Sequence, residues 1–240
     1  MEQERIGIGI VTYNRLDSLK RLVWGIEEHC ELPYDLYISI DGSTDGTFEW
    51  VKEEEYKYGY RERMGVCYGK NDILKRFRDH AYSFILEDDV IIHGPGVFKM
   101  YIRATELFGI QHFNFLAPTQ RIPSGRPNET KDGITVMFSK YLGGCFSTYT
   151  KEIIDKVGAF NYDFKGYGHG HVEHTRRIIR AGLTSPWGQF AHLVTAEPLL
   201  DHAIGTCVTP TEERLNQTRA NALVFDANIR NPEIYIPFRD

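Results

Sequence analysis

Hydrophobic and polar positions alternate in blocks along the first half of the chain. Isoleucine or valine alternates with glycine over residues 6–11, which predicts a buried strand. Apolar residues then recur at helical spacing from Leu16 to Ile26, which predicts an amphipathic helix. Beyond these elements we expect strands at 36–40, 64–68 and 83–86, helices at 48–58, 72–82 and 97–108, and extended chain at 113–117. Strands separated by helices predict an α/β fold with a mostly parallel central sheet and helices on both faces.

The pattern changes after residue 117. Residues 118–132 contain three prolines and several polar residues, which predicts a long loop. We then expect β-structure at 134–148, a short helix at 150–157, a glycine- and aromatic-rich loop at 158–170, a helix at 171–181 and a strand at 190–196. Residues 206–240 are polar and lack strong periodicity, and we interpret them as a flap that closes over a site. The chain is therefore predicted to form one merged domain with a smaller β-containing region in its second half.

Composition excludes several classes of protein. The chain has 240 residues, of which 42% are hydrophobic and 25% charged, as in ordinary globular proteins. Its net charge of −5 and the lack of a basic stripe argue against a dedicated nucleic-acid binder, although one local site can still bind a nucleotide. No apolar run approaches the roughly 20 residues of a membrane span, and the N-terminus leads directly into a strand rather than a signal peptide. We therefore expect a cytoplasmic protein.

Cysteine usage agrees with that expectation. The four cysteines are widely spaced and form no Cys-x-x-Cys pair. In a chain of this length they indicate reduced thiols rather than a disulfide framework or a zinc site. They are Cys30, Cys67, Cys145 and Cys207.

Polar clusters follow three of the expected strands, over residues 12–15, 41–45 and 87–89. Because open parallel sheets bind ligands at the carboxyl ends of their strands, the three clusters together indicate a nucleotide-type site. The sharpest is Glu87-Asp88-Asp89, whose adjacent carboxylates repel one another and need a positive partner. In extended chain Glu87 and Asp89 would point the same way, and a carboxylate there could hold Mg²⁺ or Mn²⁺ beside phosphate oxygens. The alternative is a solvated acidic turn.

Two further features bear on chemistry. The segment 65–71 lacks the spacing of a phosphate-binding P-loop, but Lys70 could still meet a phosphate at the start of a helix. His169, His171 and His174 cluster without a zinc-protease pattern, and a zinc site there would lack a distant second pair of ligands. A neutral histidine at a helix start can act as a general base. His202 taken alone is interpreted as structural.

These segments, in this order, resemble the GT-A glycosyltransferases of the family 2 type. The resemblance covers about residues 6–205 and is carried by the segments 10–15, 41–47, 65–71, 87–89, 157–168 and 177–182. Of these, 41–47 looks like the family's Asp-x-Ser-x-Asp-x-Thr segment, and Glu87-Asp88-Asp89 looks like its metal-binding "DxD" motif. Each motif is short, but the ordered set is specific.

The resemblance implies a donor site. Its nucleotide-binding residues would be Thr12, Tyr13, Asn14, Arg15, Asp41, Lys70 and Asp88. Thr12 and Asp41 would contact the base, and Asp41 would accept a hydrogen bond from a uracil N–H. Lys70 would lie near the nucleotide or its phosphates, and Asp88 would approach the ribose or the sugar.

The resemblance also implies a metal. Asp89 would ligate it, and His202 best fits the place of a late histidine ligand, with His192 as the spare candidate. Imidazole ligation would favour Mn²⁺ over Mg²⁺ as the cofactor.

One departure from the family concerns the catalytic base. After Gly-Tyr-Gly the family shows Glu-Asp, and the Asp is the base; here Gly170-His171 occupies that place. His171 could substitute, since a neutral imidazole accepts a proton near pH 7. Glu173 is the second choice, although it could instead support Arg176 or Arg177.

The resemblance implies a metal-dependent, inverting glycosyltransferase that uses a nucleotide-sugar donor, UDP-sugar above all, and a saccharide or other hydroxyl acceptor. It would move a hexosyl or N-acetylhexosaminyl group. Residues 1–117 would bind the donor, 118–205 would hold the acceptor and catalytic residues, and 206–240 would form the tail. One alternative is a nucleotidyltransferase, which the first loop disfavours because residues 12–15 lack a glycine-rich signature. Another is a non-catalytic nucleotide- or sugar-binding module.

Overall fold

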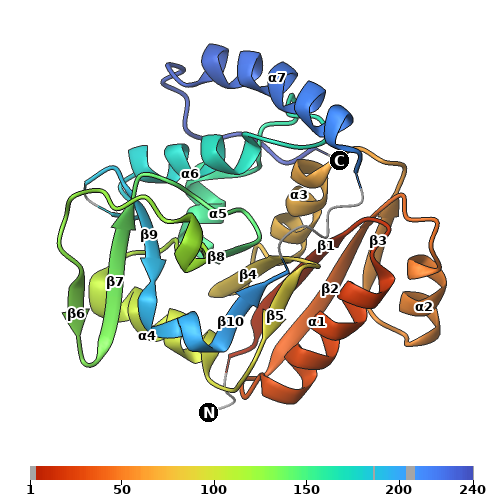
Figure 1. Ribbon diagram of the computed structural model, residues 1–240, viewed down its shortest axis with the longest axis horizontal. Coiled ribbons are helices and arrows are strands. Elements are labelled where there is room, and N and C mark those ends of the chain that lie inside the picture. The colour runs from red at the N-terminus through yellow and green to blue at the C-terminus, as the bar shows by residue number, and fades with distance from the viewer. Residues whose placement is uncertain (1–3, 186, 204–208, 240) are drawn as a thin grey trace.

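The computed structural model describes residues 4–239 except 186 and 204–208, and it centres on one five-stranded sheet (Figure 1). The strands lie in the order β3-β2-β1-β4-β8, in which the first four are parallel and β8 runs antiparallel to β4. Their bounds are β1 Ile6–Thr12, β2 Tyr34–Asp41, β3 Tyr58–Arg61, β4 Tyr82–Glu87 and β8 Phe146–Thr150. The expected mostly parallel sheet is confirmed.

Helices cover both faces of this sheet, as expected. One hydrophobic core lies beneath α1, α2 and α4, and a second lies beneath α3, α5 and α6. The helices span α1 Leu16–His29, α2 Thr47–Glu53, α3 Val66–Arg76, α4 Val97–Phe108, α5 Lys151–Val157 and α6 Gly170–Arg180. Within the described residues no helix is both long and apolar enough to cross a membrane.

The alternation of isoleucine and glycine in β1 reflects the different packing of the sheet's two faces. Ile6, Ile8 and Ile10 fill the core beneath α1. On the other face a Cβ at Gly7 would lie 2.5 Å from Phe77, and one at Gly9 would lie 2.1 Å from Ile73. Both distances are far below contact, so α3 packs directly on the bare backbone of β1. This close packing brings the start of α3 to the carboxyl edge of the sheet.

The second half adds the smaller β-containing region. An antiparallel sheet has the order β6-β7-β9, and a separate pair joins β5 to β10. The bounds are β5 Val90–Ile92, β6 Glu129–Lys131, β7 Ile134–Ser139, β9 Phe190–Leu193 and β10 Leu200–His202, with short 3₁₀ helices η1 Pro118–Gln120 and η2 Val194–Leu199. Because β10 pairs antiparallel with β5, His202 lies opposite Val90, directly after the acidic run.

Several expected elements were wrong in place or type. The third strand is Tyr58–Arg61 rather than 64–68, because Gly65 with φ +101° begins α3 there. The helix expected at 48–58 ends at Glu53, before Glu55 adopts φ +57° and turns the chain. The next helix accordingly covers Val66–Arg76 instead of 72–82. Val66, Cys67 and Tyr68, which read as part of a strand, thus lie in the first turn of a helix, where Cys67 is buried.

The tail contains a long helix that the sequence did not indicate. α7 (Thr211–Asn228) lies across α6 at the top of the view in Figure 1. Asn221 is buried and binds the loop below, because its Nδ2 donates to the carbonyls of Lys165 and Tyr167 and its Oδ1 accepts from the Lys165 amide. Polar side chains therefore attach this helix, which explains the missing apolar stripe. Cys207, one of the four cysteines expected to be reduced, lies outside the described residues.

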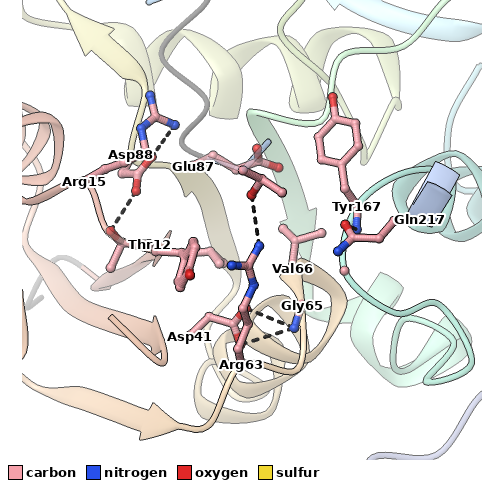
Figure 2. Close-up of a pocket in the computed structure, with 14 residues that line it drawn as sticks. Thr12, Arg15, Asp41, Arg63, Gly65, Val66, Glu87, Asp88, Tyr167 and Gln217 are labelled. Atoms are coloured by element: carbon pink, nitrogen blue, oxygen red, sulfur yellow. Dashed lines mark hydrogen bonds and ion pairs between the residues drawn. The ribbon is translucent and has the colours of Figure 1, made fainter. Parts of the chain in front are cut away.

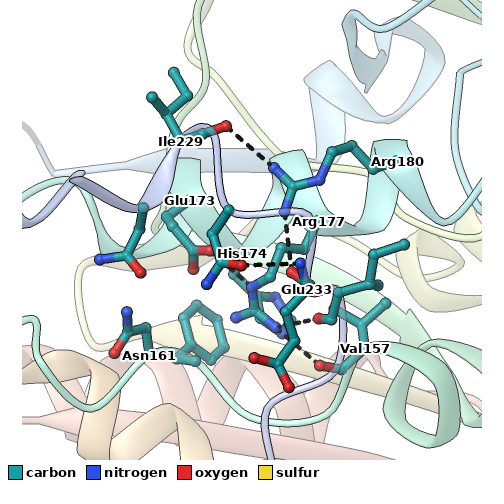
Figure 3. Close-up of polar contacts among 12 residues, drawn as sticks. Val157, Asn161, Glu173, His174, Arg177, Arg180, Ile229 and Glu233 are labelled. Carbon is teal, nitrogen blue, oxygen red and sulfur yellow. Dashed lines mark hydrogen bonds and ion pairs between the residues drawn. The ribbon is translucent and has the colours of Figure 1, made fainter. Parts of the chain in front are cut away.

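Arg177 connects α6 to the segment after α5 and to the C-terminal segment. Its side chain is fully buried, and its Nε donates to Glu173 Oε1 at 2.8 Å. The remaining donors reach the main-chain carbonyls of Val157, Ala159 and Ile234 at 2.7–3.0 Å, and Figure 3 shows this guanidinium between the helix and the C-terminal segment. A planar group with five donors suits several fixed carbonyls, so Arg177 holds α6 in place.

We predict that His112 makes the protein acid-sensitive. It is buried between β8 and α6, bound to the Thr148 carbonyl and to Thr175 Oγ1, and burial lowers its pKa to about 4. The unfolded chain protonates this side chain at about pH 6.5. Between these values acid adds a proton only to the unfolded state, so the free energy of unfolding should fall as pH drops from about 6.5 to 4. Urea denaturation across that range measures this change, and the free energy of unfolding should depend less steeply on pH in His112→Asn than in the wild type. Equal slopes in the two proteins would contradict the prediction.

Candidate active site

The three polar clusters meet in one open cleft at the carboxyl edge of the sheet. The cleft has a cavity volume of about 120 Å³, and Thr12, Asp41 and Asp88 from three different strand ends line it. Figure 2 shows Thr12 and Arg15 on one side and Tyr167 and Gln217 on the other. The three strand ends therefore line one cleft, and the nucleotide-type site expected there stays a prediction. The far wall comes from the loop before α6 and from α7.

Arg15 is the positive partner that the acidic run requires. Its Nη1 lies 2.8 Å from Asp88 Oδ1 and 3.4 Å from Asp89 Oδ2, and Thr12 Oγ1 donates to Asp88 Oδ2 at 2.7 Å. Burial nevertheless raises the pKa of Asp88 to about 7. β4 ends at Glu87, and Asp88 and Asp89 form a turn, so the strand alternation expected through this run does not continue.

Glu87 is held by a buried lysine. Lys70 is 1% exposed, and its Nζ donates to Glu87 Oε1 at 2.8 Å and to the Gly144 carbonyl at 2.7 Å. Burial alone would raise the pKa of Glu87, but the Lys70 ammonium outweighs it and lowers that pKa. Glu87 lines the cleft while Lys70 lies behind it. The phosphate contact expected of Lys70 stays a prediction, and this geometry points to a role behind the cleft.

The loops after β1 and β2 are fastened to one another. The Asn14 amide donates to Ser43 Oγ, and Asn14 Oδ1 accepts from the Thr44 amide at 2.7 Å. Asp41 accepts hydrogen bonds from the amides of Met64 and Gly65 at 2.8–3.2 Å. These contacts shape the cleft floor, so Asn14 holds the loops together and Asp41 anchors the start of α3.

The chain resembles known proteins in sequence and in fold. No protein-family model matches the chain. It is 26% identical over 193 residues to an uncharacterized glycosyltransferase of Acanthamoeba polyphaga mimivirus, covering 75% of each chain. A mannosyltransferase from Pyrobaculum calidifontis, solved with GDP-mannose and Mn²⁺, matches with a TM-score of 0.62 and 16% identity over 97% of this chain and 66% of that one. The chain has a GT-A-like glycosyltransferase fold.

A second solved structure has the same fold. TarS of S. aureus, residues 1–349 in complex with UDP, matches with a TM-score of 0.51 and 14% identity over 67% of this chain and 51% of that one. The present chain thus spans about two thirds of the mannosyltransferase and half of the TarS fragment. At these identities the solved structures establish the GT-A-like fold, in agreement with the resemblance found in the sequence.

A metal would find two free ligands beside the cleft of this GT-A-like fold. Asp89 Oδ1 and His202 Nδ1 are buried and have no hydrogen-bond partner among the described residues. The pairing of β5 with β10 places His202 opposite Val90, the residue after Asp89, and the Ala203 amide donates to the Asp89 carbonyl at 2.9 Å. One carboxylate oxygen and one imidazole nitrogen suit Mn²⁺. No three His, Cys, Asp or Glu residues gather there in the part of the chain described, so other ligands would have to come from the donor or water.

His192, the spare ligand candidate, is occupied elsewhere. It is buried in β9, and its two ring nitrogens face the carbonyls of Asn114 and Tyr141 at 2.7 and 3.1 Å. Neither nitrogen is directed toward the acidic run. Asp89 and His202 therefore remain the pair that fits a metal.

The clustered histidines diverge around the start of α6. His169 packs against Phe225 of α7, and the buried His174 stacks on Phe160 and binds the Gly158 carbonyl. His171 is half-buried and lies against Gly144, behind which Lys70 and Glu87 are paired. Glu173, the second candidate base, is buried and bound to Arg177. Of the two candidate bases, His171 is therefore the one next to the acidic run.

Several lining residues were not expected from the sequence. The Arg63 guanidinium stacks 3.8 Å from the Tyr13 ring, and Arg63 Nη2 binds Thr209 Oγ1 at 3.0 Å. Gln217 of α7 accepts from the Tyr167 amide at 2.9 Å. Tyr167 lies in a segment that the resemblance covered, but Thr209 and Gln217 fall in a tail without periodicity. No local signal in the sequence indicates these two residues.

We predict that Lys70 stabilises the fold through its buried ion pair. Lys70→Met would leave the Glu87 carboxylate without its cation, and the free energy of unfolding should fall by about 3 kcal/mol. Urea denaturation measures this change. Lys75→Met, at an exposed lysine of the same helix, is the matched control and should lose less than about 1 kcal/mol. Equal losses in the two variants would contradict the prediction.

Proposed function

We propose that this protein is a metal-dependent, inverting glycosyltransferase that uses a nucleotide-sugar donor, a UDP-sugar above all, and a hydroxyl acceptor. The observation that carries the proposal is the pair of unsatisfied buried ligand atoms, Asp89 Oδ1 and His202 Nδ1, beside a cleft at the carboxyl edge of a GT-A-like sheet. The mannosyltransferase neighbour was solved with GDP-mannose and Mn²⁺, and TarS with UDP, which supports a nucleotide donor and a divalent metal.

The nucleotide would occupy the cleft between β1 and α7. Tyr13, stacked by Arg63, offers an aromatic surface there, and Asp41 keeps acceptor capacity beyond the two amides that it binds. A uracil N–H could use that remaining capacity. Arg15 would balance the charge of Asp88 while Asp88 approaches the ribose or the sugar. This arrangement supports UDP as the nucleotide of the donor. The alternative is a guanine nucleotide, since the mannosyltransferase neighbour was solved with GDP-mannose.

Asp89 and His202 would hold Mn²⁺, which when bound supplies Lewis-acid stabilisation of the leaving diphosphate. In the transfer itself the acceptor oxygen forms a bond to the anomeric carbon as the bond from that carbon to the diphosphate breaks. The electron pair of the broken bond leaves with the nucleoside diphosphate. The proton of the acceptor hydroxyl passes to His171, and a single displacement of this kind inverts the configuration.

His171 would be available as the base throughout the neutral range. Burial lowers its pKa to about 4, so the ring is neutral at pH 7. Its place in the first turn of α6 also disfavours the charged form. The negative charge of a bound diphosphate would raise the pKa of His171 toward neutrality and make the ring a stronger base.

We predict that UDP and Mn²⁺ together stabilise the protein against heat. Binding at about 100 times the dissociation constant adds about 2.7 kcal/mol, or roughly 5–10 °C in a domain of this size. Differential scanning fluorimetry with UDP, GDP and CMP, each with and without Mn²⁺, measures the shift. Asp89→Ala and His202→Gln should abolish the Mn²⁺-dependent part. Asp79→Asn, at an exposed carboxylate, should keep it.

The outcomes of this panel separate the alternatives. A shift with GDP instead of UDP would keep the fold-based proposal and change the donor. A shift without any need for Mn²⁺ would overturn the metal dependence. No shift with any nucleotide would overturn the donor site itself.

We predict that His171→Ala lowers sugar transfer about 10²- to 10⁴-fold while the nucleotide-induced thermal shift is kept. UDP release from a UDP-sugar that gave a shift, with water or a simple saccharide as acceptor, measures turnover. Glu173→Gln should instead lower the melting temperature and leave turnover per folded molecule near wild type, because Glu173 binds Arg177. Wild-type turnover in His171→Ala would show that this base assignment is wrong. Binding without turnover in the wild type would favour a non-catalytic module.

A further inference from the structure

We infer that Gly144 and Lys70 are positioning residues for His171: Lys70 fixes the main chain at Gly144, and the absent side chain of Gly144 makes room for the imidazole. The inference rests on the proposed function, because it is there that His171 acts as the base. Neither residue touches the reacting atoms in this scheme. Each would act through the orientation of the ring.

The main chain at Gly144 is held at two consecutive carbonyls. The Lys70 ammonium donates to the Gly144 carbonyl at 2.7 Å, and the Glu87 amide donates to the Cys145 carbonyl at 2.7 Å. Lys70 is itself fixed by its ion pair with Glu87 at 2.8 Å and is almost fully buried. This connection between β7 and β8 is therefore fastened to α3 and to the end of β4. It forms a fixed surface behind the cleft.

The His171 ring lies directly against this surface. A Cβ added to Gly144 would come within 2.7 Å of Cε1 and Nδ1 of His171 and 2.9 Å of Cγ. Non-bonded carbon atoms prefer about 3.5–4.0 Å, so any side chain at 144 would displace the ring. The backbone of Gly144 is not in the left-handed region, so an alanine is allowed there as far as φ is concerned. The space taken by the imidazole is thus what requires glycine.

Packing is also what orients this ring. Carbonyl oxygens lie at hydrogen-bond distance from ring nitrogens of His112, His174 and His192. His171 has no such partner among the described residues, and the groups acting on its pKa are burial and the charges of Lys70, Glu87 and His169. No hydrogen bond within the described residues therefore fixes the direction of the ring. A base without its own hydrogen bond depends on its packing surface for direction, and a misplacement of about 1 Å can cost 10²-fold in rate.

The test is Gly144→Ala, measured on the full chain with Mn²⁺ and the UDP-sugar that gives the largest thermal shift. We expect kcat for UDP release to fall about 10- to 100-fold. The donor KM should stay within about twofold of wild type, and the UDP-induced thermal shift should stay within about 2 °C of wild type. Gly25→Ala is the matched control, since its Cβ would meet Ile92 at an ordinary 3.5 Å. It should keep wild-type kcat and KM.

A spectroscopic readout makes the test independent of turnover. In protein labelled with ¹³C-histidine, the imidazole signal absent from His171→Ala identifies His171. That signal should shift in Gly144→Ala and not in Gly25→Ala, while the His112 signal stays in place in both. Lys70→Met, where it folds, should shift the His171 signal in the same way.

The outcomes distinguish this inference from the proposed function. Wild-type kcat and an unmoved His171 signal in Gly144→Ala would overturn the inference and leave the glycosyltransferase proposal intact. A fall in kcat without movement of the ring signal would overturn it as well, because the defect would then be general. A wild type that binds no nucleotide and turns over no donor would overturn the proposed function, and the role of Gly144 in catalysis with it.

Discussion

The structure depends on how negative charge is distributed along the carboxyl edge of one sheet. Four carboxylates converge there, and their partners differ except that Asp88 and Asp89 share Arg15. Asp41 accepts hydrogen bonds from backbone amides, and Glu87 forms an ion pair with Lys70. Asp88 pairs with Arg15 and accepts a hydrogen bond from Thr12. Asp89 shares Arg15 and keeps one buried oxygen without a partner. Burying a charge without compensation is costly, so this division lets the edge remain acidic. The same contacts fix the start of α3 and the β7–β8 connection, so the charge balance and the shape of the cleft arise together.

The sequence predicted the central architecture because burial there imposes strong periodic patterns. The glycines of β1 and the stripe of α1 each reflect contact with a single neighbouring layer. The β3 and α3 boundaries were misplaced because a positive φ at Gly65 decides where the helix starts, and no apolar pattern records that angle. α7 was missed for another reason. Asn221 and Gln217 attach it to a distant loop through hydrogen bonds that leave no periodic trace, beside the packing of Val224 and Phe225.

The candidate site was predictable as far as strand ends determine it. Thr12, Asp41 and Asp88 follow buried strands, and parallel topology brings them together. The hydrogen-bond partners of Lys70 were not predictable, because one of them is a carbonyl 74 residues away in the sequence. Support of Arg177 by Glu173 was among the alternatives that the sequence offered, whereas the carbonyls that Arg177 also binds lie in separate segments. The closeness of Asp89 and His202 arises from a short strand pair that has no signal of its own.

The far wall of the cleft also has a consequence for biosynthesis. Arg63 forms a hydrogen bond with Thr209, which lies 146 residues later in the chain, and Gln217 accepts a hydrogen bond from the Tyr167 amide. Chains emerge from the ribosome N-terminus first, and early segments fold before late ones are made. The acidic edge can therefore form, with Arg15 in place, while the nascent polypeptide still lacks the helix that encloses it. The cleft would be completed only once Thr209 and α7 have left the exit tunnel and α7 has docked.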